Sequence, residues 1–492
     1  MTEVRTRFAP SPTGLMHVGG MRTAFVAWLL AKHHGGKFLL RIEDTDQERL
    51  VPGAVRFIIE ELQWFGIVPD EAPSRAELKE IGEDWDGAPD LGGPCGPYIQ
   101  SHRGPRYREV AEMLVASGAA YRCDCTAEML AEDRARQQER KESPGYSGRC
   151  RDRNVAADKP HVVRLKIPHD ASMSFDDGIK GKITWDSISL RDTVLLKSDG
   201  LPLYHLAVVV DDHDMGITQV LRGEEWLAST PIHLLVYKAL GWTPPSIAHL
   251  PVVMGTDGKK LSKRRGAPAS NLLREQGYLA DAILNYLTLI GWNPGEGTEQ
   301  EVFSRQELIE KFTLDRCNSA NGVFDPAKLL WMNGLYIRRL SVEQFTDAVK
   351  PFIEKAGLKF DEARWRPLVA HVQERAKTLV EVPPMVDYLF TDKIAREMKE
   401  MFQKGVDAPK AKEILLRSES RLVALEDFSH TALEAALRPI AEELGLKVGP
   451  MLGVVRIAVT GKKVSPPLFE SMSALGKEVT LVRVREALGE LG

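Results

Sequence analysis

The sequence predicts an α/β nucleotide-binding fold in its first half and a mostly helical second half. Residues 4–42 read as a strand, a Pro/Gly loop, a helix and a second strand. This is a βαβ unit, with parallel strands and a right-handed crossover. A stretch of mixed pattern at about 105–200 interrupts the α/β alternation and indicates an inserted α+β domain. From about residue 278 to the end, apolar residues recur at helical spacing.

The βαβ unit is predicted element by element. A β-type run at 4–8 precedes the loop, and a helix follows at 21–34, with Ala24, Trp28 and Ala31 on one side. Gly35-Gly36 ends that helix as a C-terminal glycine cap does. The second strand is expected at 37–42.

The middle of the chain returns to this pattern after an interruption. Residues 70–105 are rich in Gly, Pro and acid and are expected to be loop, with 74–89 a solvated surface insertion. A strand is predicted at 162–167 within the inserted domain. The α/β pattern resumes near Tyr204, with a helix at 226–240 and a strand at 249–254.

The composition is that of a soluble globular protein. The chain has 492 residues, 43% hydrophobic and 27% charged, and its length suggests about three or four domains. It lacks both an apolar run of the ~20 residues that a membrane helix needs and the apolar segment of a secretory signal. A cytoplasmic protein is therefore expected. The net charge of −4 weighs against a general nucleic-acid coat protein, and five cysteines do not predict a disulfide framework.

The loop after the first strand has the sequence PSPTGLMHVGG, residues 10–20. It opens a helix, where backbone N–H groups and the helix dipole attract phosphate. Its glycines allow a nucleotide to approach the backbone, and His17 can donate a hydrogen bond to a phosphate oxygen. On this motif alone, an ordinary turn with a surface histidine is an equally good interpretation.

A basic loop follows the last predicted strand of the α/β half. KKLSKRR, residues 259–265, has five basic residues in seven and lies between glycines at 255, 258 and 266. A mobile cationic loop can close on a triphosphate and stabilise charge as pyrophosphate leaves. For this loop taken alone, a solvated or nucleic-acid-binding face is the favoured interpretation.

Together the two motifs resemble the HIGH and KMSKS signatures of class I aminoacyl-tRNA synthetases, here HVGG and KLSKR. The stretches RFAPSPTGLMHVGG, RIEDTD, YHLAVVVDDHDMG, LRGEEW and VFDPAKLLWMNGLYIR are similar to those of bacterial glutamyl-tRNA synthetases. A dinucleotide oxidoreductase is disfavoured, because no GxGxxG motif follows the first strand.

The resemblance implies a Rossmann-type catalytic domain with an inserted α+β acceptor-stem domain, followed by all-helical anticodon-binding domains. The expected boundaries are 1–104 and 201–256 for the two catalytic halves, 105–200 for the insertion, 257–339 for a linking domain with the KLSKR loop, and 340–392 and 393–492 for two helical domains. The implied activity is a glutamate–tRNA ligase. It would use ATP and Mg²⁺ to form glutamyl adenylate with tRNA bound, and would load tRNA(Glu) as a monomer.

Two alternatives to that activity stay open. One is a non-discriminating enzyme that also charges tRNA(Gln). The other is an inactive synthetase-like RNA-binding protein, which the intact motifs disfavour.

The resemblance also implies the site residues. Arg7 and Arg222 would bind the carboxylates of glutamate, which suits guanidinium groups. Glu43 would pair with the ammonium group. The whole glutamate-binding set is Arg7, Ala9, Ser11, Glu43, Tyr204 and Arg222, and the set acting on ATP is His17, Gly19, Gly20, Lys260, Ser262 and Lys263. Arg375 falls near an arginine that rejects the tRNA(Gln) anticodon. Structural ion pairs, a core tyrosine and a surface arginine are the alternatives.

Three cysteines gather in the inserted domain, as Cys123-x-Cys125 and Cys150. Clustered thiols in a chain without disulfides suggest tetrahedral Zn²⁺, which takes four ligands. The resemblance implies a fourth ligand two residues after the last cysteine, which is Asp152 here, with Tyr146 as the alternative. Buried cysteines without metal are the competing interpretation.

Overall fold

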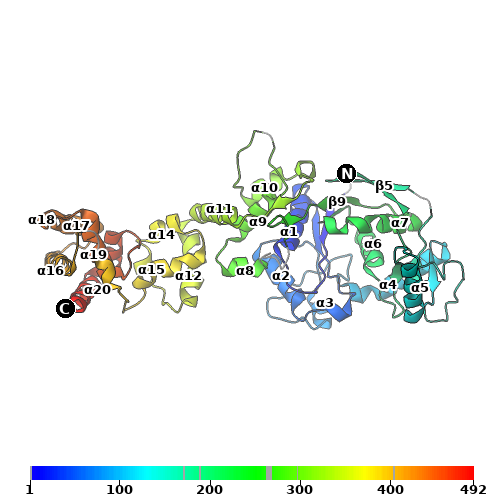
Figure 1. The fold of residues 1–492 in the computed structure, drawn as a ribbon, viewed down its shortest axis with the longest axis horizontal. Coiled ribbons are helices and arrows are strands. Elements are labelled where there is room, and N and C mark those ends of the chain that lie inside the picture. The colour runs from blue at the N-terminus through cyan, green and yellow to red at the C-terminus, as the bar shows by residue number, and fades with distance from the viewer. Residues whose placement is uncertain (1–2, 170–171, 188–189, 262–268, 296, 403–404) are drawn as a thin grey trace. The chain divides into compact units, whose positions relative to one another are not determined.

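The computed structural model describes residues 3–169, 172–187, 190–261, 269–295, 297–402 and 405–492 (Figure 1). They form two compact units, one of Met1–Leu272 with Ile283–Asp325 and one of Leu273–Ala282 with Pro326–Gly492. Among the described residues, none of the helices combines the length and apolar character that crossing a membrane requires.

The first unit is built on parallel strands, as predicted. β1 (Arg5–Phe8) pairs with β2 (Lys37–Leu40), and β8 (Gln219–Gly223) pairs with β9 (Ser246–Leu250). The Thr218 N–H donates to the Arg5 carbonyl at 3.0 Å, which joins β1 to the start of β8. The crossover helix α1 (Val18–His33) is buried along most of its length, since it packs between strands and the rest of the unit.

The inserted region is α+β, as predicted. Strands β3 (Ala120–Cys123), β4 (Val162–Leu165) and β7 (Val194–Leu196) form an antiparallel sheet in the order β3-β4-β7. Helices α4 (Gly104–Ala116) and α5 (Ala127–Glu139) precede and follow β3. A separate hairpin, β5 (Ser172–Asp177) and β6 (Gly181–Asp186), pairs antiparallel.

The second catalytic stretch then supplies α6 (Tyr204–Asp214), the 3-10 helix η4 (Glu224–Ser229) and α7 (Thr230–Leu240). The strand predicted at 249–254 is interrupted: β9 ends at Leu250 and β10 (Val253–Met254) pairs with β11 (Gly322–Val323) instead. Pro251 stands at the break, where it lacks the N–H that a strand ladder needs.

The prediction of an all-loop, solvated stretch at 70–105 is wrong in part. After α2 (Ala54–Trp64), a short helix α3 (Arg75–Glu80) forms on a capping box, in which Ser74 and Glu77 satisfy each other's backbone N–H groups. Leu78 is fully buried and Trp85 is 8% exposed. The Glu77 carboxylate also accepts from the Tyr98 N–H at 2.7 Å. Residues 74–89 therefore include a helix rather than only loop; half of them are exposed, as expected of a surface insertion, and Leu78 and Trp85 anchor them to the unit.

The second unit is helical throughout its described residues, as predicted. One apolar core runs through it, with Trp365, Phe345 and Leu415 fully buried. Its longer helices are α11 (Pro326–Arg339), α12 (Val342–Lys355), α16 (Ala408–Ala424), α19 (Val448–Thr460) and α20 (Leu468–Leu491). Shorter ones are α13 (Glu362–Trp365), α14 (Val369–Arg375), α15 (Val382–Val386), α17 (His430–Leu437) and α18 (Pro439–Glu443).

Candidate active site

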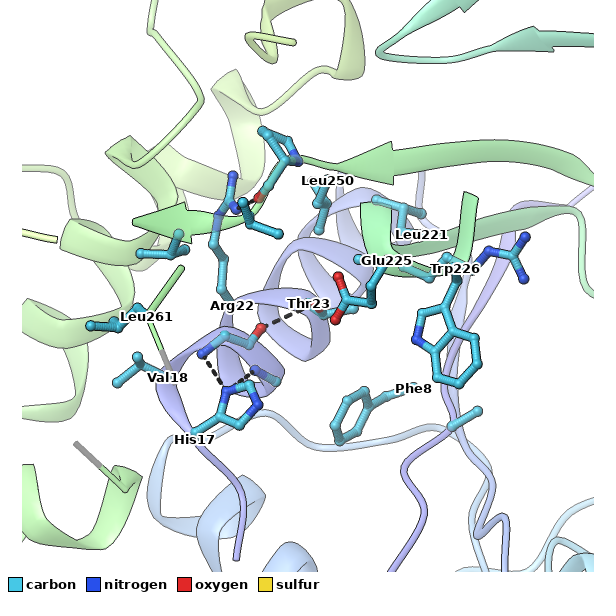
Figure 2. Close-up of a pocket in the computed structure, with 18 of the residues that line it drawn as sticks. Phe8, His17, Val18, Arg22, Thr23, Leu221, Glu225, Trp226, Leu250 and Leu261 are labelled. Atoms are coloured by element: carbon cyan, nitrogen blue, oxygen red, sulfur yellow. Dashed lines mark hydrogen bonds between the residues drawn. The ribbon is translucent and has the colours of Figure 1, made fainter. Parts of the chain in front are cut away.

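A cavity of about 230 Å³ opens at the carboxyl ends of β1, β8 and β9, beside the start of α1 (Figure 2). In an open α/β sheet, this edge is where ligands bind. The predicted residues that line it are Arg7, Ala9, His17, Gly19, Gly20, Glu43, Tyr204, Arg222 and Lys260. Ser11 is exposed and is not in the lining. Ser262 and Lys263 lie outside the described residues.

His17 caps the amino end of α1. Its Nδ1 accepts from the Gly19 N–H at 3.0 Å and from the Gly20 N–H at 3.3 Å (Figure 2). An Nδ1 that accepts carries no proton, so in the neutral ring the proton is on Nε2. Nε2 is therefore a hydrogen-bond donor at the positive end of a helix dipole, which suits a phosphate oxygen.

A buried series of alternating arginines and carboxylates holds Glu43, the acidic residue that lines the cavity, in place. Arg41, which is 0% exposed, contacts Asp212 at 2.8 Å and Glu43 at 3.1 Å. Arg7 donates from Nε to the same Asp212 oxygen at 3.0 Å. Burial raises the pKa of Glu43, against the neighbouring arginines that lower it. Glu43 thus lines the cavity as a desolvated carboxylate beside two cations.

Arg222 on β8 is buried in a different way. It is 5% exposed, and burial lowers its pKa. Its donors go to neutral groups: Nε to His249 Nε2 at 2.9 Å, Nη1 to the Tyr204 hydroxyl at 3.1 Å, and Nη2 to the Thr230 hydroxyl at 2.7 Å. No acidic group within the described part of the chain forms an ion pair with it. A buried guanidinium without an ion-pair partner among the described residues is suited to bind an anion.

Trp226 and Glu225 are among the lining residues that were not predicted. The Trp226 ring lies 4.5 Å from the Tyr204 ring and closes that side of the cavity. Glu225 lines the same edge, and its carboxylate lies 3.8 Å from Lys260 Nζ. Both belong to the LRGEEW stretch, whose charged and aromatic residues directly after a strand end were the available signal.

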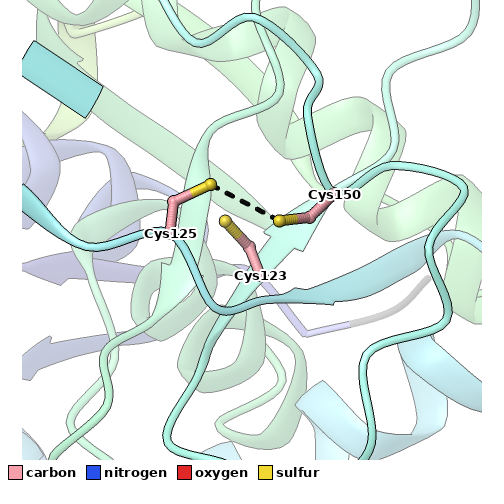
Figure 3. A group of neighbouring side chains, drawn as sticks. All are labelled: Cys123, Cys125 and Cys150. Carbon is pink, nitrogen blue, oxygen red and sulfur yellow. Dashed lines mark hydrogen bonds between the residues drawn. The ribbon is translucent and has the colours of Figure 1, made fainter. Parts of the chain in front are cut away.

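The three cysteines predicted to bind metal come together at the end of β3 (Figure 3). Their sulfur atoms lie within 4.8 Å of one another. Tyr146 joins them: its hydroxyl is 3.4 Å from Cys123 Sγ and accepts from the Cys150 N–H at 2.9 Å.

The structure does not bring Asp152 to this cluster, contrary to the primary prediction. Its carboxylate pairs with Lys166 at 3.0 Å, and the side chain is 83% exposed. The carboxylate that lies near the sulfurs is Asp124, 3.2 Å from Cys150 Sγ. The position two residues after Cys150, which the resemblance implied, therefore lies outside the sulfur cluster in this structure, and Asp152 as a metal ligand stays a prediction.

Arg375 ends α14 in the second unit and is exposed. It donates from Nη1 to the Ser465 carbonyl at 2.8 Å. One hydrogen bond to a carbonyl orients the guanidinium and leaves its charge available to a ligand.

Comparison with known proteins identifies the family. The family described as tRNA synthetases class I (E and Q), catalytic domain, matches residues 3–331, and the anticodon binding domain family matches 344–488. A glutamate–tRNA ligase of Dehalococcoides mccartyi is 45% identical, over 99% of this chain and 98% of its own. That of Geobacter sulfurreducens is 40% identical over both whole chains. The solved glutamate tRNA ligase of Elizabethkingia meningosepticum, in complex with its amino acid, superimposes with a TM-score of 0.87 at 32% identity, over both whole chains.

Proposed function

The chain belongs to the glutamate–tRNA ligase family of class I tRNA synthetases, and we propose that its cleft joins glutamate to tRNA(Glu) at the expense of ATP. The observation that carries the proposal is the buried guanidinium of Arg222, which has no ion-pair partner among the described residues, in the same cavity as the carboxylate of Glu43. An amino acid with a second carboxylate can place that carboxylate on Arg222 and its ammonium group on Glu43.

Glutamate is bound through its three charges. The side-chain carboxylate accepts from Arg222, helped by the Tyr204 hydroxyl that Arg222 already contacts. Arg7, whose Nε donates to Asp212, is the second cation available to a carboxylate. The ammonium pairs with Glu43, and Ala9 forms part of the wall. The predicted contact of Ser11 with the ammonium stays a prediction.

The first step forms glutamyl adenylate. An oxygen of the α-carboxylate attacks the α-phosphorus of ATP, the new O–P bond forms, and pyrophosphate leaves with the electrons of the broken bond. This chain's residues position and stabilise charge, since no proton needs to move. His17 donates from Nε2 to the phosphates, and Lys260, Ser262 and Lys263 bind the departing pyrophosphate. Mg²⁺, when bound, neutralises phosphate charge.

The second step loads the tRNA. The 2′-hydroxyl oxygen of the terminal adenosine attacks the adenylate carbonyl, the ester bond forms as the bond between that carbonyl carbon and the phosphate oxygen breaks, and AMP leaves while the hydroxyl proton passes to its phosphate. Residues 105–200 would bind the acceptor stem, and the helical unit would bind the anticodon, where Arg375 would reject tRNA(Gln). We also propose that activation requires bound tRNA, and that the enzyme acts as a cytoplasmic monomer.

The cysteine cluster supports a structural zinc ion. Three thiols within 4.8 Å of one another are donors that Zn²⁺ prefers, and the Tyr146 phenolic oxygen, 3.4 Å from one sulfur, would be the fourth ligand. Cys123, Cys125, Cys150 and Tyr146 would hold the ion and tie the end of β3 to the loop at 146–150. Zinc there would fix local structure, without a part in the chemistry.

Charging of separate, purified tRNA(Glu) and tRNA(Gln) with labelled glutamate and ATP tests the proposal. Charging of tRNA(Glu) alone is the expected result. Charging of both would keep the chemistry and remove the role given to Arg375. Failure to charge either with folded protein would refute the proposal and favour the inactive RNA-binding alternative.

A further inference from the structure

The hairpin β5–β6 of the inserted region is attached to the catalytic sheet beside the glutamate cavity. The Gly178 N–H, at the hairpin turn, donates to the Ile247 carbonyl on β9 at 2.9 Å. Lys180 donates to the Ser319 carbonyl at 2.7 Å and pairs with Glu224. A Cβ on Gly178 would lie 3.2 Å from the Ala248 side chain, so the turn is in close contact with β9.

Asp177, the last residue of β5, points its carboxylate into this contact. Its side chain is fully buried. Oδ1 accepts from the Ile179 and Lys180 N–H groups at 2.9 and 2.8 Å, and from the His249 N–H at 3.2 Å. Oδ2 lies 2.5 Å from His249 Nδ1. One carboxylate therefore shapes the hairpin turn and also contacts the imidazole of β9.

His249 connects that carboxylate to Arg222. The Arg222 Nε–H donates to His249 Nε2 at 2.9 Å, and an arginine can only donate. His249 Nε2 is therefore unprotonated, and the single ring proton is on Nδ1, donated to Asp177. If the proton moved to Nε2, two N–H groups would face each other. The pair thus fixes one tautomer, as carboxylates do for metal-bound and catalytic histidines.

Other groups around His249 agree with a neutral ring. Thr230 Oγ1 lies 3.4 Å from Nε2, and the Phe175 ring meets the imidazole edge-on at 6.3 Å between centroids. The charges that act on it are Asp177, Arg222 and Lys180. On its other side, Arg222 Nη1 lies 3.2 Å from His233 Nδ1, a second ring nitrogen that must accept.

We propose that Asp177 and His249 are positioning residues for glutamate: through the fixed His249 tautomer, the hairpin of the inserted region aims Arg222 at the side-chain carboxylate. This proposal rests on the proposed function. Because Asp177 also shapes the hairpin turn, selection of the amino acid depends on how the inserted region sits on β9. Neither residue lines the cavity, so both act through Arg222.

Asp177→Asn is the direct test, since it keeps the size of the side chain. If the amide oxygen keeps the turn, the amide N–H₂ faces His249 Nδ1 and drives the proton to Nε2, against Arg222. KM for glutamate in tRNA charging is expected to rise about 10- to 100-fold, the usual effect of losing one hydrogen bond to a charged group. KM for ATP and KM for tRNA are expected to change little.

Asp192→Asn is the matched control. Asp192 is 8% exposed and is bonded to Tyr121 and Arg151 in the same inserted region, so its substitution makes the same charge change away from Arg222. It should leave KM for glutamate at the wild-type value. Equal increases in all three KM values with Asp177→Asn, or the same glutamate defect in both variants, would show a general structural role and overturn the proposal.

His249→Gln tests whether Asp177 acts on Arg222 through His249 rather than through the stability of the fold. The amide oxygen can still accept from Arg222 Nε, whereas contact with Asp177 is lost. We expect this variant to raise KM for glutamate by less than Asp177→Asn does, because an acceptor for Arg222 remains, and Asp177→Asn to have little further effect in its background, as a shared interaction requires. Additive effects would refute coupling through His249. If wild-type protein fails to charge glutamate at all, the proposed function fails first, which is a distinct result.

Discussion

Gly19→Ala tests whether the His17 ring is aimed by the backbone of α1. A Cβ on Gly19 would lie 2.9 Å from His17 Cε1 and 3.0 Å from Nδ1, closer than carbon atoms approach. The ring must turn away, which breaks its contacts with the Gly19 and Gly20 N–H groups. Nε2 is then no longer directed at the phosphates.

The size of the effect follows from the bonds lost. Losing the helix cap costs about 1 kcal/mol of stability. Losing one hydrogen bond to a charged phosphate in the transition state costs about 1.5–3 kcal/mol, or about 10- to 150-fold in kcat. KM for glutamate should stay constant, because Arg222 and Glu43 lie elsewhere in the cavity. Steady-state charging of tRNA(Glu) with varied ATP and glutamate measures both constants.

Two variants make the result interpretable. Gly104→Ala is a matched control at the start of α4, since its Cβ would meet only the end of the Arg108 side chain, at 3.5 Å. In a His17→Ala background, Gly19→Ala should add almost nothing, as expected of two changes that act on one group. Wild-type kcat for Gly19→Ala, with a large defect for His17→Ala, would refute the steric argument.

Four further results are expected. Tyr146→Phe should lower zinc affinity about tenfold or more in chelator competition, whereas Asp152→Asn should not; the reverse would restore Asp152 as the ligand. Because burial lowers the pKa of His249, the ring stays neutral and KM for glutamate should stay constant from pH 8 down to about 6.5. Below that pH the melting temperature should fall, because His249 binds a proton in the unfolded chain but not in the folded one. A rise in KM for glutamate centred near pH 6.5 would contradict this. Arg375→Ala should raise charging of tRNA(Gln) relative to tRNA(Glu) at an unchanged melting temperature; an unaltered ratio would mark a surface arginine. Trp85→Ala should destabilise the protein by about 3 kcal/mol without changing kcat, and a neutral effect would return residues 74–89 to a solvated loop.

The fold was predictable where local pattern and three-dimensional structure agree. β1, α1 and β2 follow from alternation, a glycine cap and apolar spacing, each of which acts within a few residues. The helix at Arg75–Glu80 was missed although its capping box, Ser74 with Glu77, was readable. The neighbouring sequence is rich in Gly, Pro and acidic residues, and this composition was given more weight than the four-residue capping box. The burial of Trp85 depends on tertiary packing, which composition does not specify.

The site was predictable only in part. Arg7, Glu43, Tyr204 and Arg222 were assigned by resemblance, and the fold does gather them at one cavity. Sequence spacing could not supply the partners that give them their properties. Asp177 contacts a histidine 72 positions away, through a register that only the folded hairpin defines. Likewise, the orientation of Asp152 toward Lys166 depends on one turn.

Arg222, which lines the cleft, and Arg41, which contacts Glu43 from the buried interior, show what distinguishes a structural cation from a binding one. Arg41 contacts three carboxylates, Asp211, Asp212 and Glu43, at 2.8 to 3.5 Å, so an incoming anion would have to displace a partner. Arg222 is surrounded by imidazole and hydroxyl acceptors, which satisfy its N–H groups without neutralising its charge. Burying such a charge costs several kcal/mol, and a bound carboxylate offsets part of that cost. Neutral acceptors therefore orient Arg222 and leave its positive charge available to bind an anion. This is why the protonation state of His249, one of these acceptors, matters to the choice of substrate.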